Sequence, residues 1–176
     1  MPVSLKAVFL FCLAAAALLP CTGSCRGSLT DGEKLATVYG MYDNYKTDFP
    51  GVKDISPGDA MALLAGGKAL FIDTRNTEEM EVSMLPGAIT GKEYTAGGDT
   101  YAGRVPIAYC TISYRSGVFS SERTKKGATV YNLRGGLLAW VLEGGKVYDK
   151  KGNETKRIHV YGRRWDYPPR GYSSVY

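Results

Sequence analysis

The middle of the chain alternates between short runs dominated by apolar residues and longer stretches in which apolar residues recur at helical spacing. The apolar runs occupy residues 69–72, 105–109 and 128–132, and each predicts a strand that is buried on both faces. Helical stretches at roughly 76–82, 116–125 and 137–143 separate and follow these runs. Strands that alternate with helices predict an α/β fold, in which right-handed crossovers build a parallel sheet with helices on both faces.

Two more helices are expected before the first of these strands. From Asp31 to about Tyr45, apolar side chains recur every three or four positions, which predicts a helix that packs its aromatic face on the domain. At Ser56, a capping residue, a proline at the first helical position and an acidic residue three positions on predict a second helix, which Gly66-Gly67 ends. Residues 91–104, rich in Gly, Thr and Tyr, are expected to form a loop.

The N-terminus has the pattern of an export signal. Lys6 precedes an uncharged run from Ala7 to Leu19, and Pro20 ends that run. A run of this length is short for a membrane-spanning helix but fits the apolar region of a signal peptide, and the small residues after Pro20 suit cleavage. We therefore expect an exported protein that is periplasmic or anchored to the membrane as a lipoprotein, facing outside the cytoplasm.

The cysteines divide between this leader and the folded part. Cys21 and Cys25 lie in the expected cleavage zone, and either is a candidate for lipidation, with plain secretion an equal alternative. Cys12 would leave with the signal peptide. The folded part then holds only Cys110, so no internal disulfide is expected there.

Composition and charge narrow the function classes. The chain has 176 residues, of which 44% are hydrophobic and 22% charged, which are globular values, and its formal charge is a mild +5. The basic residues are scattered until the C-terminus, so binding to nucleic acid is not expected. Residues 148–176 interleave basic residues with Tyr and Trp; contact with nucleic acid or a membrane is one interpretation, and packing of the aromatic rings on the domain is the favoured one. The protein is expected to be a monomer, with membrane contact only through a lipid anchor.

The sharpest candidate for chemistry is the loop that follows the strand at 105–109 and precedes a helix beginning near Arg115 or Ser116. Sites in parallel sheets lie at the carboxyl ends of strands. Backbone N–H groups and a helix N-terminus there would favour the thiolate form of Cys110 and make it a nucleophile. Arg115 adds a permanent positive charge that suits an oxyanion such as thiosulfate. The plain alternative is that Cys110 is a small buried apolar residue at a strand end.

Three separated stretches of the chain resemble the rhodanese-like family of single-domain sulfurtransferases, in the family's order and spacing over about residues 53–147. They are Phe71-Ile72-Asp73-Thr74-Arg75 through Glu79 to Leu85-Pro86-Gly87-Ala88-Ile89, then Cys110 to Arg115 followed by Ser116-Gly117, and then Asn132-Leu133-Arg134-Gly135-Gly136-Leu137-Leu138-Ala139-Trp140. Two places depart from the family pattern. Ser83 and Met84 stand where Gly-His is common, and Ser113 stands where Gly is common.

The resemblance implies a five-stranded parallel sheet with helices on both faces. It also implies that Cys110 takes sulfane sulfur from a small donor such as thiosulfate or a persulfide, holds it as a persulfide, and passes it to a thiol, a protein acceptor or cyanide, without a metal or cofactor. The loop residues Thr111, Ile112, Ser113, Tyr114 and Arg115 would cradle that persulfide.

The resemblance also suggests roles around the loop. Asp73 and Arg75 fall at positions that look structural, in an ion-pair network beneath it. If position 113 needs a positive φ, Ser113 carries a modest penalty and adds a hydroxyl near the sulfur. The expected organisation is a signal peptide at 1–25, a linker and helix at 26–52, the rhodanese-like domain at 53–147, and an extension at 148–176 that packs on the domain.

Other functions use similar features. A phosphatase or arsenate reductase also places Cys and Arg on a loop of an α/β sheet, but usually with five residues between them. Here four residues separate Cys110 from Arg115, which suits a single sulfur atom better than a tetrahedral oxyanion. An exported rhodanese-like module that binds a partner or acts in thiol redox is the remaining alternative; partner-binding modules typically lose the cysteine, which this chain keeps.

Overall fold

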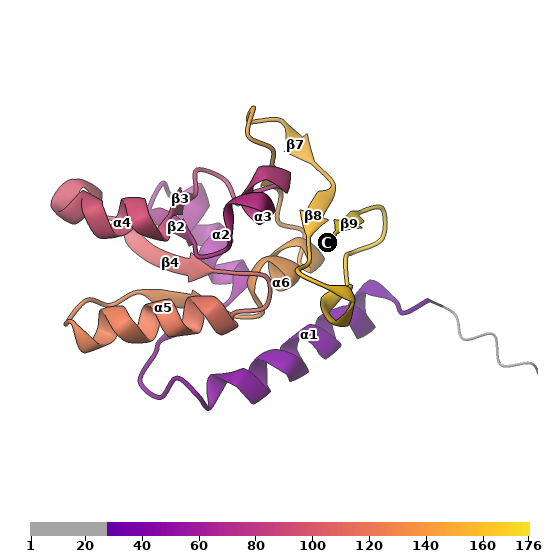
Figure 1. Cartoon of the computed structure of the whole chain (residues 1–176), viewed down its shortest axis with the longest axis horizontal. Helices are drawn as coiled ribbons and strands as arrows, with labels where there is room; N and C mark the ends of the chain where they lie inside the picture. The colour runs from indigo at the N-terminus through magenta and orange to yellow at the C-terminus, as the bar shows by residue number, and fades with distance from the viewer. Residues whose placement is uncertain (1–27) are drawn as a thin grey trace, which may run out of the picture.

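The computed structural model describes residues 28–176 (Figure 1). The expected signal peptide and the candidate lipidation sites Cys21 and Cys25 lie outside the described residues. The helices are α1 (Asp31–Lys46), α2 (Pro57–Ala65), α3 (Thr77–Val82), α4 (Gly91–Gly97), α5 (Tyr114–Lys125) and α6 (Gly136–Leu142), with short 3-10 turns η1 (Gly98–Tyr101) and η2 (Arg163–Trp165). The strands are β1 (Asp54–Ile55), β2 (Ala69–Asp73), β3 (Ile89–Thr90), β4 (Val105–Tyr109), β5 (Tyr131–Leu133), β6 (Val147–Tyr148), β7 (Glu154–Thr155), β8 (Arg157–His159) and β9 (Ser173–Val175).

A five-stranded parallel sheet forms the centre of the fold, in the order β1-β5-β4-β2-β3. The predicted α/β fold class is therefore confirmed. β2 and β4 pair along their whole length, from Ala69 opposite Val105 to Asp73 opposite Tyr109. Their carboxyl ends consequently lie side by side, and so do the residues that follow them.

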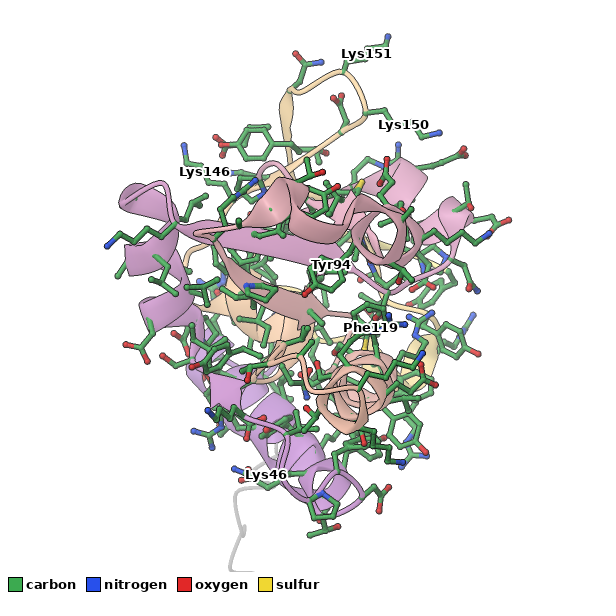
Figure 2. The ribbon with its side chains drawn as sticks, turned by 90° about the vertical axis from the view of Figure 1, so that its left-hand side faces the viewer. Lys46, Tyr94, Phe119, Lys146, Lys150 and Lys151 are labelled. Atoms are coloured by element: carbon green, nitrogen blue, oxygen red, sulfur yellow. The ribbon has the colours of Figure 1, made fainter. Side chains whose placement is uncertain are left out.

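The two central strands are buried on both faces, as their unbroken apolar runs predict. Every residue of β2 is buried, and its side chains alternate between two clusters. One cluster includes Phe71 and lies under α2 and α6, with α1 packed outside against α6. The other includes Leu70 and lies under α4 and α5, where Tyr94 and Phe119 meet edge to face across the sheet surface (Figure 2).

Two sequence-based expectations about the elements are wrong. Residues 91–104 are not a plain loop, because α4 and η1 form there. Thr90 and Glu93 supply the start of α4: each side chain accepts a hydrogen bond from the other residue's backbone N–H, at 3.1 and 2.7 Å. β5 begins at Tyr131 rather than Ala128, because the Ala128 N–H bonds the Arg123 carbonyl and closes the end of α5.

The two ends of the described chain are joined to each other. The Asp31 carboxylate, in the first turn of α1, accepts the backbone N–H of Arg170 at 2.9 Å, and the Lys34 ammonium bonds the Pro168 carbonyl at 2.7 Å. In Figure 1 the yellow C-terminal segment accordingly lies against the indigo helix. Ile158 and Val160 of that segment are fully buried in the larger cluster, and Trp165 and Tyr172 pack against it.

No helix within residues 28–176 is both long and apolar enough to cross a membrane.

Candidate functional site

Cys110 lies at the carboxyl edge of the sheet, directly after β4, and four residues separate it from Arg115 in α5. It is 2% exposed and is a free thiol, and it lines a pocket that opens above the loop. Thr111, Ile112 and Ser113 are also buried, whereas Tyr114 is half exposed. The structure thus brings all the predicted loop residues together at one edge of the sheet, and α5 begins at Tyr114, one or two residues earlier than expected.

The N-terminus of α6 holds the loop from beneath. The backbone N–H groups of Leu137 and Leu138 donate to the carbonyls of Cys110 and Thr111, at 2.8 and 3.2 Å. Gly136, with φ of +60°, makes this approach feasible, since a Cβ at that position would overlap the carbonyl of Cys110 and approach the Ile112 nitrogen at 2.9 Å. Gly136 in the third stretch of the sequence therefore allows α6 to approach the cysteine loop, whereas Gly135 allows the close approach of Val38 in α1.

Ser113 adopts the left-handed conformation, with φ of 78°, and precedes the first residue of α5. The positive φ considered from the sequence is therefore present. Its hydroxyl donates to the Leu133 carbonyl at 2.5 Å, and its own carbonyl accepts the Asn132 side-chain amide at 3.2 Å. The hydroxyl thus ties the loop to β5, and these bonds compensate part of the backbone strain.

A buried ion pair lies beside the start of the loop. The Arg75 guanidinium grips both carboxylate oxygens of Asp73 at 2.9 and 2.7 Å and also bonds the Ser83 carbonyl at 2.6 Å. The Tyr109 hydroxyl donates to Asp73 and accepts the Leu85 N–H at 3.1 Å. Burial and the Asp73 charge raise the pKa of Tyr109 well above its usual value, so that hydroxyl keeps its proton. The network joins β2, β4 and residues 83–85.

Arg115 is paired with Glu79, an acidic residue for which the sequence pattern predicts no role in the site. Its guanidinium donates to both carboxylate oxygens of Glu79 in α3, at 2.5 and 2.8 Å. Glu79 is 2% exposed, and it also accepts the Asn76 N–H that begins α3. Burial alone would raise the pKa of Glu79, but the hydrogen bonds from Arg115 and from the Asn76 N–H, together with the Arg115 charge, outweigh it and hold that pKa below 4.5, the usual value. The sequence predicts that the positive charge of Arg115 binds an oxyanion, but in the structure the negative charge of Glu79 already compensates it.

The pocket over Cys110 has a volume of about 420 Å³. Besides loop residues, its walls come from segments on both sides of the cysteine motif: Tyr45 at the end of α1, and Tyr161 and Trp165 from the C-terminal segment. Tyr161 stands with its ring 5.0 Å from the Arg115 guanidinium carbon. Helical spacing drew attention to Tyr45 and composition to the aromatic tail, but neither pattern could place these rings over the cysteine.

Within residues 28–176, no three His, Cys, Asp or Glu side chains come together as a metal site.

Comparison with known proteins agrees with this geometry. The profile of the rhodanese-like domain matches residues 56–143. Among solved structures, the thiosulfate sulfurtransferase of Pseudomonas aeruginosa superposes with a TM-score of 0.50 at 20% identity, over 70% of this chain and 24% of that one.

Two smaller structures have lower scores. The human single-domain sulfurtransferase has a TM-score of 0.41 at 22% identity, over 52% of this chain and 96% of that one. A Rhodopseudomonas palustris protein of unknown function, described as a possible tyrosine phosphatase, has a TM-score of 0.48 at 21% identity, over 61% and 91% of the two chains. No curated protein matches the chain. At these identities the structural neighbours establish the fold alone.

Proposed function

Because the chain belongs to the rhodanese-like domain family, we propose that it is a sulfurtransferase that carries sulfane sulfur as a persulfide on Cys110. The observation that carries this proposal is the position of Cys110: a free thiol that lines a pocket, on a short loop held between β5 and α6. A cysteine with a purely structural role would have no need of the pocket beside it.

The proposed reaction has two steps. In the first, the Cys110 thiolate attacks the outer sulfur of a donor; a new S–S bond forms, and the donor's own bond to that sulfur breaks. With thiosulfate the electron pair leaves on sulfite. In the second step a thiolate or cyanide attacks the outer sulfur of the persulfide, and the Cys110 thiolate leaves. Each step is a displacement at sulfur, so no net oxidant or metal is required.

Loop length favours this reaction over phosphate hydrolysis. With four residues between Cys110 and Arg115, the loop encloses less space than the five-residue loops usual for phosphatases. The pairing of Arg115 with Glu79 adds to this preference, because a dianionic phosphate would meet the Glu79 carboxylate beside the arginine.

The test is the intact mass of residues 26–176 after incubation with sulfane donors. We expect Cys110 to gain one sulfur atom, about 32 Da, and to lose it to cyanide. The Cys110→Ser variant should gain nothing while keeping its circular dichroism spectrum and melting temperature. If Cys110→Ser still transfers sulfur, or if the unaltered protein hydrolyses an aryl phosphate faster than it transfers sulfur, the proposed function is wrong.

A further inference from the structure

We propose that the pocket over Cys110 selects sulfane donors that carry an aromatic ring, in preference to small inorganic donors such as thiosulfate. The inference rests on the proposed function and names the substrate class of that same site. It follows from three properties of the pocket: its aromatic walls, its volume, and the compensated charge at its base.

The walls of the pocket are two pairs of aromatic rings. Tyr45 and Tyr114 meet edge to face, with ring centroids 5.3 Å apart and planes at 72°. Tyr161 and Trp165 meet in the same way, at 5.4 Å and 68°. Rings arranged in this manner offer both faces and edges to a further ring, the contacts that aromatic groups prefer.

The residue that carries one of these rings, Tyr161, has a left-handed backbone conformation that tyrosine seldom adopts. Tyr161 has φ of 65°, and its backbone N–H donates to His159 Nδ1 at 3.1 Å. Its side chain remains 56% exposed beside the Arg115 guanidinium. Strained backbone positions cluster at binding and active sites, and the ring of Tyr161 lies beside Arg115 on the wall of the pocket.

The volume of the pocket fits one ring together with a sulfur-bearing group. A cavity of about 150 Å³ is enough for benzene, whereas this pocket measures about 420 Å³. Thiosulfate would leave most of that space, and all of the aromatic surface, without a partner. A donor whose ring fills the pocket would place its sulfane sulfur toward Cys110.

The charge at the base of the pocket does not favour a dianion. Both carboxylate oxygens of Glu79 bind the Arg115 guanidinium, and the ring of Tyr161 covers its face. Thiosulfate carries two negative charges and would have to compete with Glu79 for the same N–H groups. An aromatic thiosulfonate carries one negative charge and gains its affinity from its ring.

The experiment compares benzenethiosulfonate with methanethiosulfonate, which have the same charge and the same sulfane sulfur. In each reaction the Cys110 thiolate bonds to the outer sulfur, the S–S bond to the sulfonyl group breaks, and the sulfinate leaves with the electron pair. Burial and stacking of one ring predict a kcat/KM that is roughly 10- to 100-fold higher for the benzene compound. Thiosulfate should be slower than either.

Trp165→Ala and Tyr161→Ala should each lower this phenyl-to-methyl ratio, by roughly threefold or more. The control is Tyr101→Ala. The ring of Tyr101 stacks on that of Tyr94 in α4, with ring centroids 6.0 Å apart, and Tyr101 does not line the pocket. Trp165→Phe, which keeps a ring and packs conservatively, should retain most of the preference if the alanine variants prove unstable.

A second measurement separates this proposal from the proposed function. Benzenesulfinate should bind the unreacted protein at least tenfold more tightly than methanesulfinate, followed by the fluorescence of Trp165 and checked with Trp165→Phe. If every donor transfers sulfur with a phenyl-to-methyl ratio near one, the substrate class is wrong and the sulfurtransferase remains. If no donor transfers sulfur, the proposed function fails, and equal binding of the two sulfinates would overturn the pocket's selectivity as well.

Discussion

Gly136 lies so close to the carbonyl oxygen of Cys110 that a Cβ atom at position 136 would overlap it. The two residues are far apart in the sequence, and the contact places the N-terminus of α6 directly against the cysteine loop. Residue 136 therefore constrains the backbone of the cysteine loop, and its contacts are with backbone atoms of the loop rather than with the sulfur of Cys110.

We expect Gly136→Ala to lower the free energy of unfolding by about 2–5 kcal/mol, as the sum of a left-handed alanine and an overlap with backbone atoms. Gly87→Ala is a matched control, since Gly87 has φ of +61° and nothing within 4 Å of its Cβ position. It should cost only the conformational part, about 1–2 kcal/mol. Urea denaturation measures both, and equal losses would mean that the contact with Cys110 is unimportant.

The same pair of variants tests the loop in the reaction. Per folded molecule, Gly136→Ala should slow the sulfuration of Cys110 by roughly tenfold or more, because displaced loop atoms no longer hold the sulfur in position. Gly87→Ala should react at the normal rate.

The pairing of Glu79 with Arg115 gives a prediction about donors. Glu79→Gln keeps a hydrogen-bond acceptor but removes the negative charge, so Arg115 becomes available to an anionic donor. We expect kcat/KM for thiosulfate to rise roughly three- to tenfold relative to benzenethiosulfonate. Steady-state kinetics with the two donors measure the ratio, and a ratio that falls instead would show that Glu79 helps to bind the dianion.

Stability against acid should depend on the same carboxylate. The pKa of Glu79 in the folded protein is lowered by Arg115 below 4.5, the usual value. The unfolded chain therefore binds the proton first, and the stabilisation from this group is complete above pH 4.5 and disappears as the pH falls through the lower folded value. Urea midpoints between pH 6 and pH 3 should fall less steeply in Glu79→Gln than in the unaltered protein. Exposed Glu78, beside it in α3, provides the control as Glu78→Gln.

The hydroxyl of Tyr109 should matter for stability rather than for chemistry. Tyr109→Phe removes the donor to Asp73 and leaves the Leu85 N–H without its acceptor, inside the core. We expect a loss of about 1–3 kcal/mol in the free energy of unfolding, with sulfur transfer per folded molecule unchanged. Tyr131→Phe, in the neighbouring β5, should be nearly neutral. A large loss of activity at equal stability would assign Tyr109 a part in the reaction.

Much of the fold could be predicted because its elements are encoded locally. The runs at 69–72 and 105–109 are strands since strands buried on both faces need unbroken apolar sequence, and Ser56-Pro57 begins α2 as its capping pattern predicts. α4 was missed although Thr90 and Glu93 form a local capping pattern, because the glycines around them suggested a loop.

The site was less predictable for a physical reason. Cys110 and Arg115 lie in one continuous motif, but the partners that shape their surroundings come from distant segments. Glu79 reaches Arg115 from α3, and Tyr161 arrives from the C-terminal segment. Such contacts depend on tertiary packing, which spacing along one sequence does not reveal.

Processing of the N-terminus is an independent prediction. Lys6, the apolar run to Leu19 and the small residues after Pro20 predict that the mature protein begins between Cys21 and Arg26. Mass analysis of the N-terminal peptide from cell envelopes measures this, and an added diacylglycerol would identify the acylated cysteine. Recovery of a soluble cytoplasmic protein that still begins at Met1 would contradict export.

The aromatic walls of the pocket also bear on the order in which the protein folds. Tyr161 and Trp165 follow α6 in the chain, and the bonds of Asp31 and Lys34 to residues 170 and 168 can form only when this later segment docks on α1. A chain that ended after α6 would retain its nucleophile but lack half of the enclosure that we propose as a filter. In such a fragment the Cys110 thiol would react with oxidants and sulfur compounds without the selection that these rings are proposed to provide. Docking of the C-terminal segment therefore sets the moment at which the reactivity of Cys110 becomes selective.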